Sequence, residues 1–331
     1  MNTNATITAT AHYVPKKTLT NLDLEKFLDT SDEWIKSRTG IVKRHIVSET
    51  EATSDLCTNI ANQLLDKRGL SPDEIDLIII STCTPDYFAP STASIVQKNI
   101  GASNAWGFDL NAACTGFLYG LETGAKFIES EKYKKIIVIG ADAMSTIMDY
   151  EDRNVCILFG DGGGGVILER SKQEGGIIDS ILRMDGSGGK YLIMPGGGSR
   201  YPATIDSVKS KKHYLRQDGK TVYKFAVKGM ADVSKEILDQ NKMSSNDIKL
   251  FIPHQANKRI INATANRCKL NENQILINID KYGNTTAGTI PIGINEASEN
   301  GRLNNGDILL LSAFGAGFTW GSMLIQWNTN L

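Results

Sequence analysis

The sequence lacks the features that mark membrane-spanning, secreted and nucleic-acid-binding proteins. Its 36 Lys and Arg residues nearly balance its 37 Asp and Glu residues, so charge does not favour nucleic acid or an anionic membrane as a partner. No apolar run reaches the length of a transmembrane helix. The N-terminus shows no charged segment followed by an apolar core, so no signal peptide is expected. We therefore expect a globular protein of the cytoplasm.

Cysteine is scarce, and the spacing of the cysteines does not match a metal site. The five cysteines stand far apart, without a CxxC pair or the spacing of zinc ligands. This pattern favours free thiols in a reducing compartment, and we predict no metal and no resident cofactor. Cys57, Cys83, Cys156 and Cys268 are expected to be packing residues, with Cys156 in a strand. The surroundings of Cys114 are different.

The stretch around Cys114 predicts a nucleophile at the start of a helix. Residues 106–110 predict a strand, and a helical pattern runs from Phe117 to Ile128. Unpaired N–H groups and the positive end of the helix dipole stabilise a thiolate at such a position. The alternative is a small buried residue that packs the helix against a sheet. The rest of the chain favours the nucleophile.

Apolar strands alternate with helical patterns along the chain. Residues 75–80 and 134–140 predict fully buried strands, which are typical of an α/β sheet covered on both faces. The glycine run at 160–165 lacks both GxGxxG and the lysine of a phosphate-binding loop, so a nucleotide site is disfavoured. We expect close packing or a mobile turn there, followed by a strand.

The second half of the chain repeats the first. Three matches occur in the same order: 71–80 with 244–253 (244 − 71 = 173), Asp109 with Asp280 (280 − 109 = 171), and 136–139 with 308–311 (308 − 136 = 172). A nearly constant offset indicates two copies of one α/β unit. We predict that the halves are residues 1–172 and 173–331, joined in a polar stretch.

The repeat predicts two partners for Cys114. In the first half, the strand predicted at 106–110 leads to Cys114. In the second half, the strand predicted at 275–279 should lead to Asn284 at the equivalent position, and a strand at 248–252 ends just before His254. Ligands in α/β sheets bind at the carboxyl ends of strands, so the three side chains should converge.

This trio of side chains indicates a class of chemistry. A Cys/His pair permits nucleophilic catalysis, in which His254 can promote thiolate formation or donate to a thioester carbonyl. Together with the amide of Asn284 it can stabilise an enolate, which favours carbon–carbon bond formation over proteolysis. A structural histidine and a turn asparagine are the alternatives.

Several motifs give the chain a family resemblance. They are Asn111–Phe117, Leu158–Gly162, Pro253–Asn257, Tyr282–Thr285 and Phe314–Gly321. In this order, and over nearly the whole chain, they resemble β-ketoacyl-acyl-carrier-protein synthase III, a condensing enzyme of the thiolase superfamily. The resemblance implies an α/β, thiolase-like fold whose two duplicated halves form a layered αβαβα sandwich, and a homodimer.

The resemblance also implies a reaction that starts fatty acid synthesis. Cys114 would take the acyl group of a primer acyl-CoA, and malonyl-acyl carrier protein would then lose carbon dioxide. His254 and Asn284 would hold the enolate oxygen while the carbanion attacks the acyl-enzyme and gives 3-oxoacyl-acyl carrier protein. The backbone N–H groups of Cys114 and Ala316 would form the oxyanion hole, although Ala316 stands where the family usually has Gly.

Three further sets of residues follow from the resemblance. CoA would contact Thr30, Trp34, Arg38, Arg153, Gly219 and Asn257. The acyl pocket would contain Phe159, Leu192, Tyr223 and Phe314. The acidic carrier protein would meet Lys224, Arg259 and Arg267. Without the resemblance, Trp34 and Arg38 are surface residues of a helix predicted at 30–38, and an isolated cation is usually a solvated charge.

Other functions remain as alternatives. A ketosynthase of secondary metabolism with a non-acetyl primer would carry the same catalytic residues, and a substrate panel would separate it. A non-catalytic acyl-binding subunit should have lost the nucleophile or its partners, yet all three are present. A degradative thiolase needs a second cysteine near residues 313–317, where this chain has none.

Overall fold

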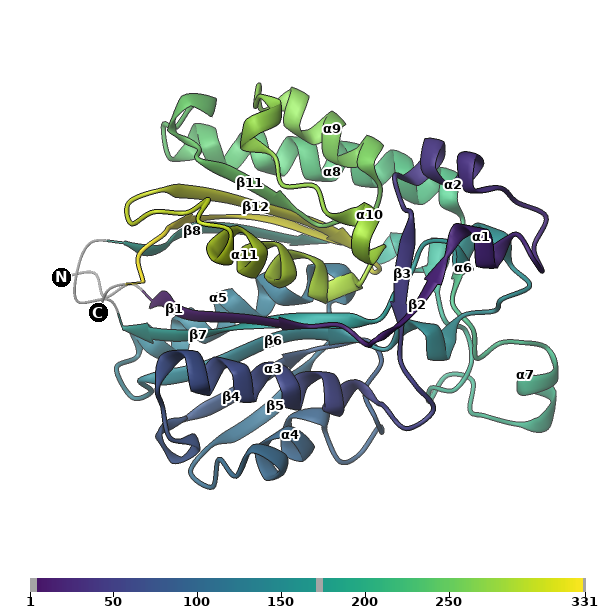
Figure 1. Cartoon of the computed structure of the whole chain (residues 1–331), viewed down its shortest axis with the longest axis horizontal. Coiled ribbons are helices and arrows are strands. Elements are labelled where there is room, and N and C mark those ends of the chain that lie inside the picture. The colour runs from purple at the N-terminus through teal and green to yellow at the C-terminus, as the bar shows by residue number, and fades with distance from the viewer. Residues whose placement is uncertain (1–4, 171–174, 330–331) are drawn as a thin grey trace.

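Two β-sheets lie face to face in the computed structural model, which describes residues 5–170 and 175–329 (Figure 1). Two helices lie between the sheets, and two more cover each outer face. The inner pair is α5 (Gly116–Glu129) and α11 (Thr289–Glu299), and the outer pairs are α3 (Thr53–Arg68) with α4 (Thr92–Ile100) and α8 (Gly219–Gln240) with α9 (Lys258–Arg267). The order of layers is αβαβα, as predicted.

The first sheet has five strands in the order β1-β7-β6-β4-β5. Their bounds are β1 Ala5–Tyr13, β7 Gly162–Arg170, β6 Lys135–Asp142, β4 Leu77–Ser81 and β5 Trp106–Leu110. β4 runs parallel to β5 and β6, whereas β7 runs antiparallel to β6 and β1. The parallel strands β4 and β5 end next to the turn that carries Cys114.

The second sheet has the same connectivity. Its strands, in the order that matches the first sheet, are β8 Gly176–Met184, β13 Thr319–Gln326, β12 Ile308–Gly315 and β11 Leu250–Pro253. β11 and β12 are parallel, and the other pairs are antiparallel. The boundary that we predicted between residues 172 and 173 lies outside the described residues.

We predicted a strand at 275–279, but only Ile275 forms a β-bridge, so the prediction is wrong for the other four residues. Ile275 makes a single parallel bridge with Phe251, at the place that β5 takes in the first sheet. The next backbone groups bond to a side chain instead of to a strand. The side-chain amide of Gln255 donates to Leu276 O (3.2 Å) and accepts from Asn278 N (3.1 Å). The chain turns at once into the short helix α10 (Ile279–Tyr282).

The remaining elements gather at the active-site end of the sheets (Figure 1). They are β2 Lys17–Thr20, α1 Asn21–Leu24, α2 Asp32–Thr39, β3 Lys43–Ile46, α6 Arg153–Cys156, β9 Leu192–Ile193, α7 Ile205–Lys209 and β10 Arg216–Gln217. Cys156 therefore lies in a helix and not in the strand that we predicted. Its apolar neighbours suggested a strand, but they are buried in a cluster with Met144 and Ile279 instead.

The glycine run explains how the second half packs on the first. Gly162–Gly165 belong to β7, so the expectation of a mobile turn is wrong and that of close packing is confirmed. A Cβ added to Gly163 would lie 2.3 Å from the Cβ of Ala141, and one added to Gly288 would lie 2.8 Å from the Cα of Gly163. The backbone that leads into α11 therefore lies directly on the first sheet.

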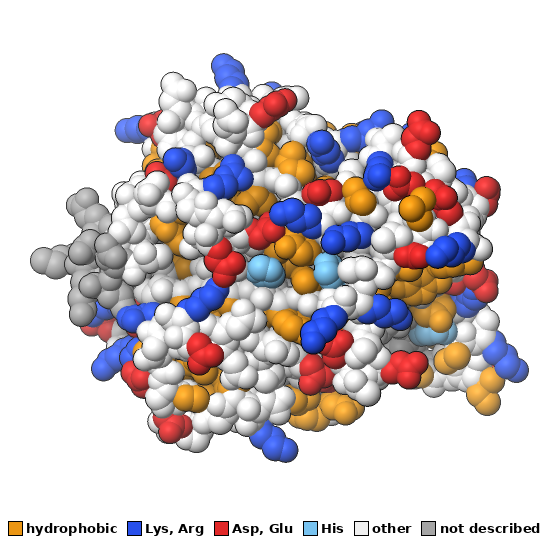
Figure 2. Space-filling model, viewed as in Figure 1, with side chains coloured by type: hydrophobic (Ala, Val, Ile, Leu, Met, Phe, Trp, Pro, Cys, Tyr) orange, Lys and Arg blue, Asp and Glu red, His pale blue; other side chains and the backbone are white. Residues whose placement is uncertain are grey.

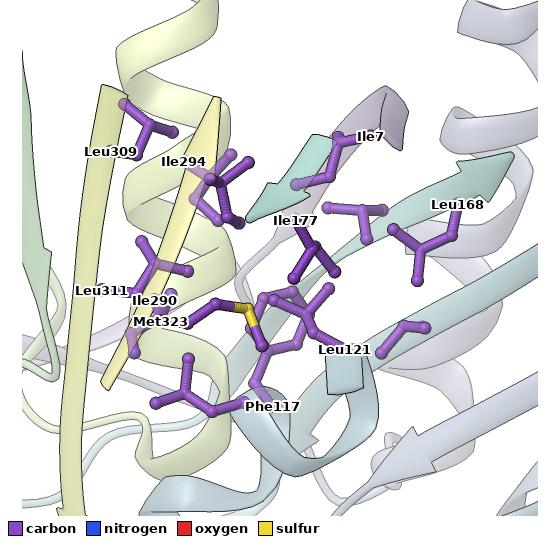
Figure 3. Packing of buried hydrophobic residues seen from close by; sticks show 14 of the residues in the cluster. Ile7, Phe117, Leu121, Leu168, Ile177, Ile290, Ile294, Leu309, Leu311 and Met323 are labelled. Atoms are coloured by element: carbon purple, nitrogen blue, oxygen red, sulfur yellow. The ribbon is translucent and has the colours of Figure 1, made fainter. Parts of the chain in front are cut away.

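An apolar core fixes the two inner helices (Figure 3). Phe117 and Leu121 of α5 are buried in one cluster with Ile290 and Ile294 of α11 and with Met323 of the second sheet. Full burial of such side chains contributes about 1.5–3 kcal/mol each. This core holds the N-terminal ends of both helices, where the functional residues lie.

The described surface is mixed in charge. Figure 2 shows Lys and Arg side chains interspersed with Asp and Glu over one face, in line with a net charge of -1. In the described ranges, we find no helix long and apolar enough to cross a bilayer.

Candidate active site

One cavity of about 710 Å³ brings the predicted catalytic residues together. Cys114, His254 and Asn284 all line it. They come from the turn before α5, the segment after β11 and the segment after α10. The convergence that the repeat predicts is therefore present in the structure, although the predicted strand before Asn284 is absent.

Cys114 lies in a 3₁₀ turn, Ala113–Thr115, and is buried. Two hydrogen bonds tie this turn to the second half: Thr115 Oγ1 donates to Thr319 O (3.2 Å), and Thr319 Oγ1 donates to Ala112 O (3.1 Å). Burial raises the pKa of the Cys114 thiol to about 12, and the charge of Asp142 acts in the same direction. Burial and this charge therefore oppose the thiolate that the helix terminus favours.

His254 is buried directly after β11. Its Nδ1 lies 2.7 Å from Oγ1 of Thr289, the first residue of α11. Burial lowers the pKa of His254 to about 3, so the imidazole is neutral. A neutral imidazole can accept a proton at one ring nitrogen or donate one from the other, but the lowered pKa makes His254 a weaker base than a free histidine.

Asn284 is held so that its amide can donate. Its Oδ1 accepts from Thr286 N (2.9 Å), which leaves Nδ2 for the cavity. Its backbone pairs with the first half, because Asn284 N donates to Leu158 O (2.9 Å) and Gly160 N donates to Asn284 O (3.1 Å). The cavity therefore combines a thiol, an imidazole and an amide donor, the set required for acyl transfer and enolate stabilisation.

The remaining predicted contact residues divide into two groups. Trp34, Arg38, Gly219, Asn257 and Arg259 line the cavity, as do Phe159, Leu192, Tyr223 and Phe314. Thr30, Arg153, Lys224, Arg267 and Ala316 are not among its lining residues. The carbonyl oxygen of Ala316 lies 3.1 Å from Thr319 Oγ1, and its neighbour Gly315 lies against Cys114 N.

The mouth of the cavity is built on α2. Ser31 Oγ accepts from Trp34 N (3.1 Å) and caps this helix, and the four-residue spacing puts Trp34 and Arg38 on one face. The guanidinium of Arg153 lies 5.5 Å from the centre of the Trp34 ring. An adenine held between Trp34 and Arg153 would need Arg153 to move.

Comparisons with known proteins agree on one family. The model of 3-oxoacyl-[acyl-carrier-protein] synthase III matches residues 108–186, and the model of its C-terminal part matches residues 238–327. β-Ketoacyl-[acyl-carrier-protein] synthase III of Chlorobaculum tepidum is 55% identical over 327 residues, which cover 98% of this chain and 99% of the relative. The chain belongs to the β-ketoacyl-acyl-carrier-protein synthase III family. It is an acyltransferase, a condensing enzyme of fatty acid synthesis.

Solved structures agree with this assignment. The crystal structure of 3-oxoacyl-[acyl-carrier-protein] synthase III from Aquifex aeolicus has a TM-score of 0.90 at 41% identity and covers 98% of this synthase and 100% of its own chain. The priming β-ketosynthase of the R1128 polyketide pathway has a TM-score of 0.91 at only 29% identity, and covers 98% of this synthase and 97% of its own chain. The alternative of secondary metabolism is therefore not favoured.

Two residues beside the predicted catalytic groups of the synthase were missed in the sequence. Asp142, buried at the end of β6, accepts from Thr82 Oγ1 (2.9 Å) and Cys83 N (2.7 Å), and also from Thr286 Oγ1. Thr289, which contacts His254, is the other. Neither belongs to a catalytic motif in the sequence. The offset of the repeat was the one available signal, since it places Thr289 at the start of the second inner helix.

Proposed function

We propose that this synthase transfers an acyl group from acyl-CoA to Cys114 and then condenses it with malonyl-acyl carrier protein. One observation carries the proposal: Cys114, His254 and Asn284 line one cavity. The outer part of that cavity contains Trp34 and Arg38, an aromatic ring and a cation suited to a nucleotide carrier. The names of the relatives point to acyl carrier protein.

In the first half-reaction, the sulfur of Cys114 attacks the thioester carbonyl of acyl-CoA. The thiol proton passes to His254 and then to the departing sulfur of CoA, so the imidazole ends neutral. The backbone N–H groups of Cys114 and Ala316 stabilise the tetrahedral oxyanion. The starting thiol is neutral, so its proton leaves as the carbon–sulfur bond forms.

In the second half-reaction, malonyl-acyl carrier protein loses carbon dioxide. His254 and Asn284 donate hydrogen bonds to the enolate oxygen that forms. The carbanion attacks the carbonyl of acyl-Cys114, and the Cys114 sulfur leaves as a thiolate and takes a proton from water, the one proton that decarboxylation of a carboxylate consumes. The products are 3-oxoacyl-acyl carrier protein and carbon dioxide, and the reaction as proposed uses acyl-CoA as a substrate without a resident cofactor or metal.

The substrates occupy separate parts of the site in this proposal. CoA contacts Thr30, Trp34, Arg38, Arg153, Gly219 and Asn257. The acyl chain packs among Phe159, Leu192, Tyr223 and Phe314. The carrier protein docks near Lys224, Arg259 and Arg267.

We also propose a homodimer that works in the cytoplasm. β5 is the last strand of its sheet, and Trp106 on this strand is 43% exposed. Phe88, in the segment between β4 and α4, is 85% exposed, an unusual state for so large an apolar side chain. A second copy that pairs along β5 would cover the open edge and Trp106. The five free cysteines suit a reducing compartment.

The decisive experiment is the intact mass of the protein after incubation with a panel of acyl-CoAs. We expect a gain of one acyl group in the wild type and none in Cys114→Ala. Cys83→Ala is the control, because this cysteine lies near Cys114 and should leave the adduct unchanged. If the wild type takes no acyl group from any acyl-CoA, the first half-reaction is wrong.

A further inference from the structure

His254 has one polar side-chain partner in the part of the chain that the structure describes. That partner is the hydroxyl of Thr289, 2.7 Å from Nδ1. Both side chains are buried, with exposed fractions of 1% for His254 and 3% for Thr289. Thr289 does not line the cavity, so it faces the reaction only through His254. Its hydroxyl also lies 3.2 Å from Thr286 O.

The two half-reactions need different tautomers of the neutral imidazole. In acylation, Nε2 must be bare to take the proton of Cys114, so the ring proton is on Nδ1. In condensation, Nε2 must carry the proton that it donates to the enolate, so Nδ1 is bare. The buried partner of Nδ1 must therefore accept a hydrogen bond in one step and donate one in the other. A carbonyl only accepts and a backbone N–H only donates, whereas a hydroxyl does both.

We propose that Thr289 is a positioning residue that serves both tautomers of His254 by rotating its hydroxyl. When Nδ1 is protonated, Thr289 accepts from it and donates to Thr286 O. Between the half-reactions the imidazole changes tautomer by exchange with water: Nε2 takes a proton from water in the cavity and Nδ1 releases one, so the ring stays neutral. When Nδ1 is bare, the hydroxyl turns and donates to it. This inference rests on the proposed roles of His254 in the two half-reactions.

The first half of the chain supports a functional reason for this hydroxyl. By the offset of the repeat, Ser81 corresponds to His254 (254 − 81 = 173) and Gly116 to Thr289 (289 − 116 = 173). There, Ser81 Oγ donates to Gly116 O (2.8 Å), and the helix packs on the strand end without a side chain at its first residue. Packing alone therefore does not require a hydroxyl at this position.

The test compares Thr289→Val with Thr289→Ser. Valine keeps the shape and removes the hydroxyl, and serine restores it. Two rates are measured apart: acylation of Cys114 by acetyl-CoA, by rapid quench and intact mass, and release of carbon dioxide from malonyl-acyl carrier protein without acyl-CoA. We expect Thr289→Val to lower both maximal rates by about ten- to a hundredfold, with KM for acetyl-CoA nearly unchanged. Thr289→Ser should stay close to the wild type.

Thr264→Val is the matched control, because this buried helical threonine donates to Ile260 O and, in the described part of the chain, has no hydrogen bond to Cys114, His254 or Asn284. The proposal is overturned if Thr289→Val keeps both rates, if only one rate falls, or if Thr289→Ser is as slow as Thr289→Val. Thermal melting checks the fold, and Thr289→Ala replaces the valine variant if that variant does not fold. A wild type that is never acylated would instead contradict the proposed function.

Discussion

The two halves of this synthase share a framework, and the proposed function divides the chemistry between them. In each half, a 3₁₀ turn with one positive φ precedes the inner helix, at Ala113 (48°) and at Thr286 (49°). The first turn presents Cys114, and the equivalent residue of the second is Ala287 (287 − 114 = 173). Conversely, the strand end that presents His254 in the second half holds only Ser81 in the first. The duplicated fold thus provides two sets of equivalent backbone positions, and the side chains at these positions determine which of them take part in the proposed chemistry.

We expect the largest difference in activity when His254 and its equivalent in the first half, Ser81, are each replaced by alanine in separate variants. We expect His254→Ala to lower the rate of 3-oxoacyl product formation by about 10²–10³, because an oxyanion donor is lost. Ser81→Ala should keep that rate and lower the free energy of unfolding by about 1 kcal/mol, because a buried hydrogen bond is lost. Equal losses of activity would mean that the halves do not divide the chemistry as described.

The next effect concerns the backbone contact between the halves. Gly164→Ala should lower the free energy of unfolding by about 1–3 kcal/mol, because the new methyl group would lie 2.8 Å from the backbone of Pro291 and Ile292 in the second half. Gly186→Ala is the control, since nothing lies within 4 Å of a Cβ built there. Urea unfolding of both variants checks the comparison, and equal stabilities would show that the contact can relax.

Acid should destabilise the second half through His254. The pKa of the buried imidazole is about 3, below its ordinary 6.5, so between these values the unfolded chain binds a proton that the folded chain does not. Stability should therefore fall as the pH drops below about 6.5, by at most about 1.4 kcal/mol per unit. Burial also lowers the pKa of His12 and of His45, so the measurement is the difference from His254→Gln in urea unfolding at pH 7 and pH 5. The variant should lose less stability, and an identical loss would rule out the His254 contribution.

The smallest effect separates two arginines of the second half. Arg259 lines the mouth of the cavity, whereas Arg267 lies 3.7 Å from the carboxylate of Asp232. We expect Arg259→Ala to raise KM for malonyl-acyl carrier protein several-fold, an effect that salt weakens, and Arg267→Ala to change it less. Steady-state kinetics at two salt concentrations provides the comparison. A larger increase of KM in Arg267→Ala than in Arg259→Ala would place the docking surface nearer the C-terminal end of α9.

Sequence patterns were sufficient for features that depend on neighbouring residues or on the internal repeat. The repeat predicted two copies of one α/β unit and the convergence of Cys114, His254 and Asn284, and small residues around Cys114 predicted the start of α5. The pattern was insufficient where a distant side chain decides the local structure. Gln255 ends the predicted strand at Ile275, and burial places Cys156 in a helix.

Electrostatics was the least predictable property. The helix terminus at Cys114 is visible in the sequence and favours the thiolate, but the depth of burial and the nearby charge of Asp142 are not visible. Those two features decide the pKa. Thr289 could not be assigned for the same reason, because its role depends on which ring nitrogen it meets in three dimensions.

The bridge between Phe159 and Asn284 joins the wall of the cavity to the segment that carries the amide of Asn284. Phe159 lies on that wall, and its neighbours Leu158 and Gly160 hold the backbone of Asn284. Under the proposed function, a primer long enough to displace Phe159 would also shift the segment that holds this amide. We therefore expect an oversized primer that still acylates the enzyme to be elongated slowly.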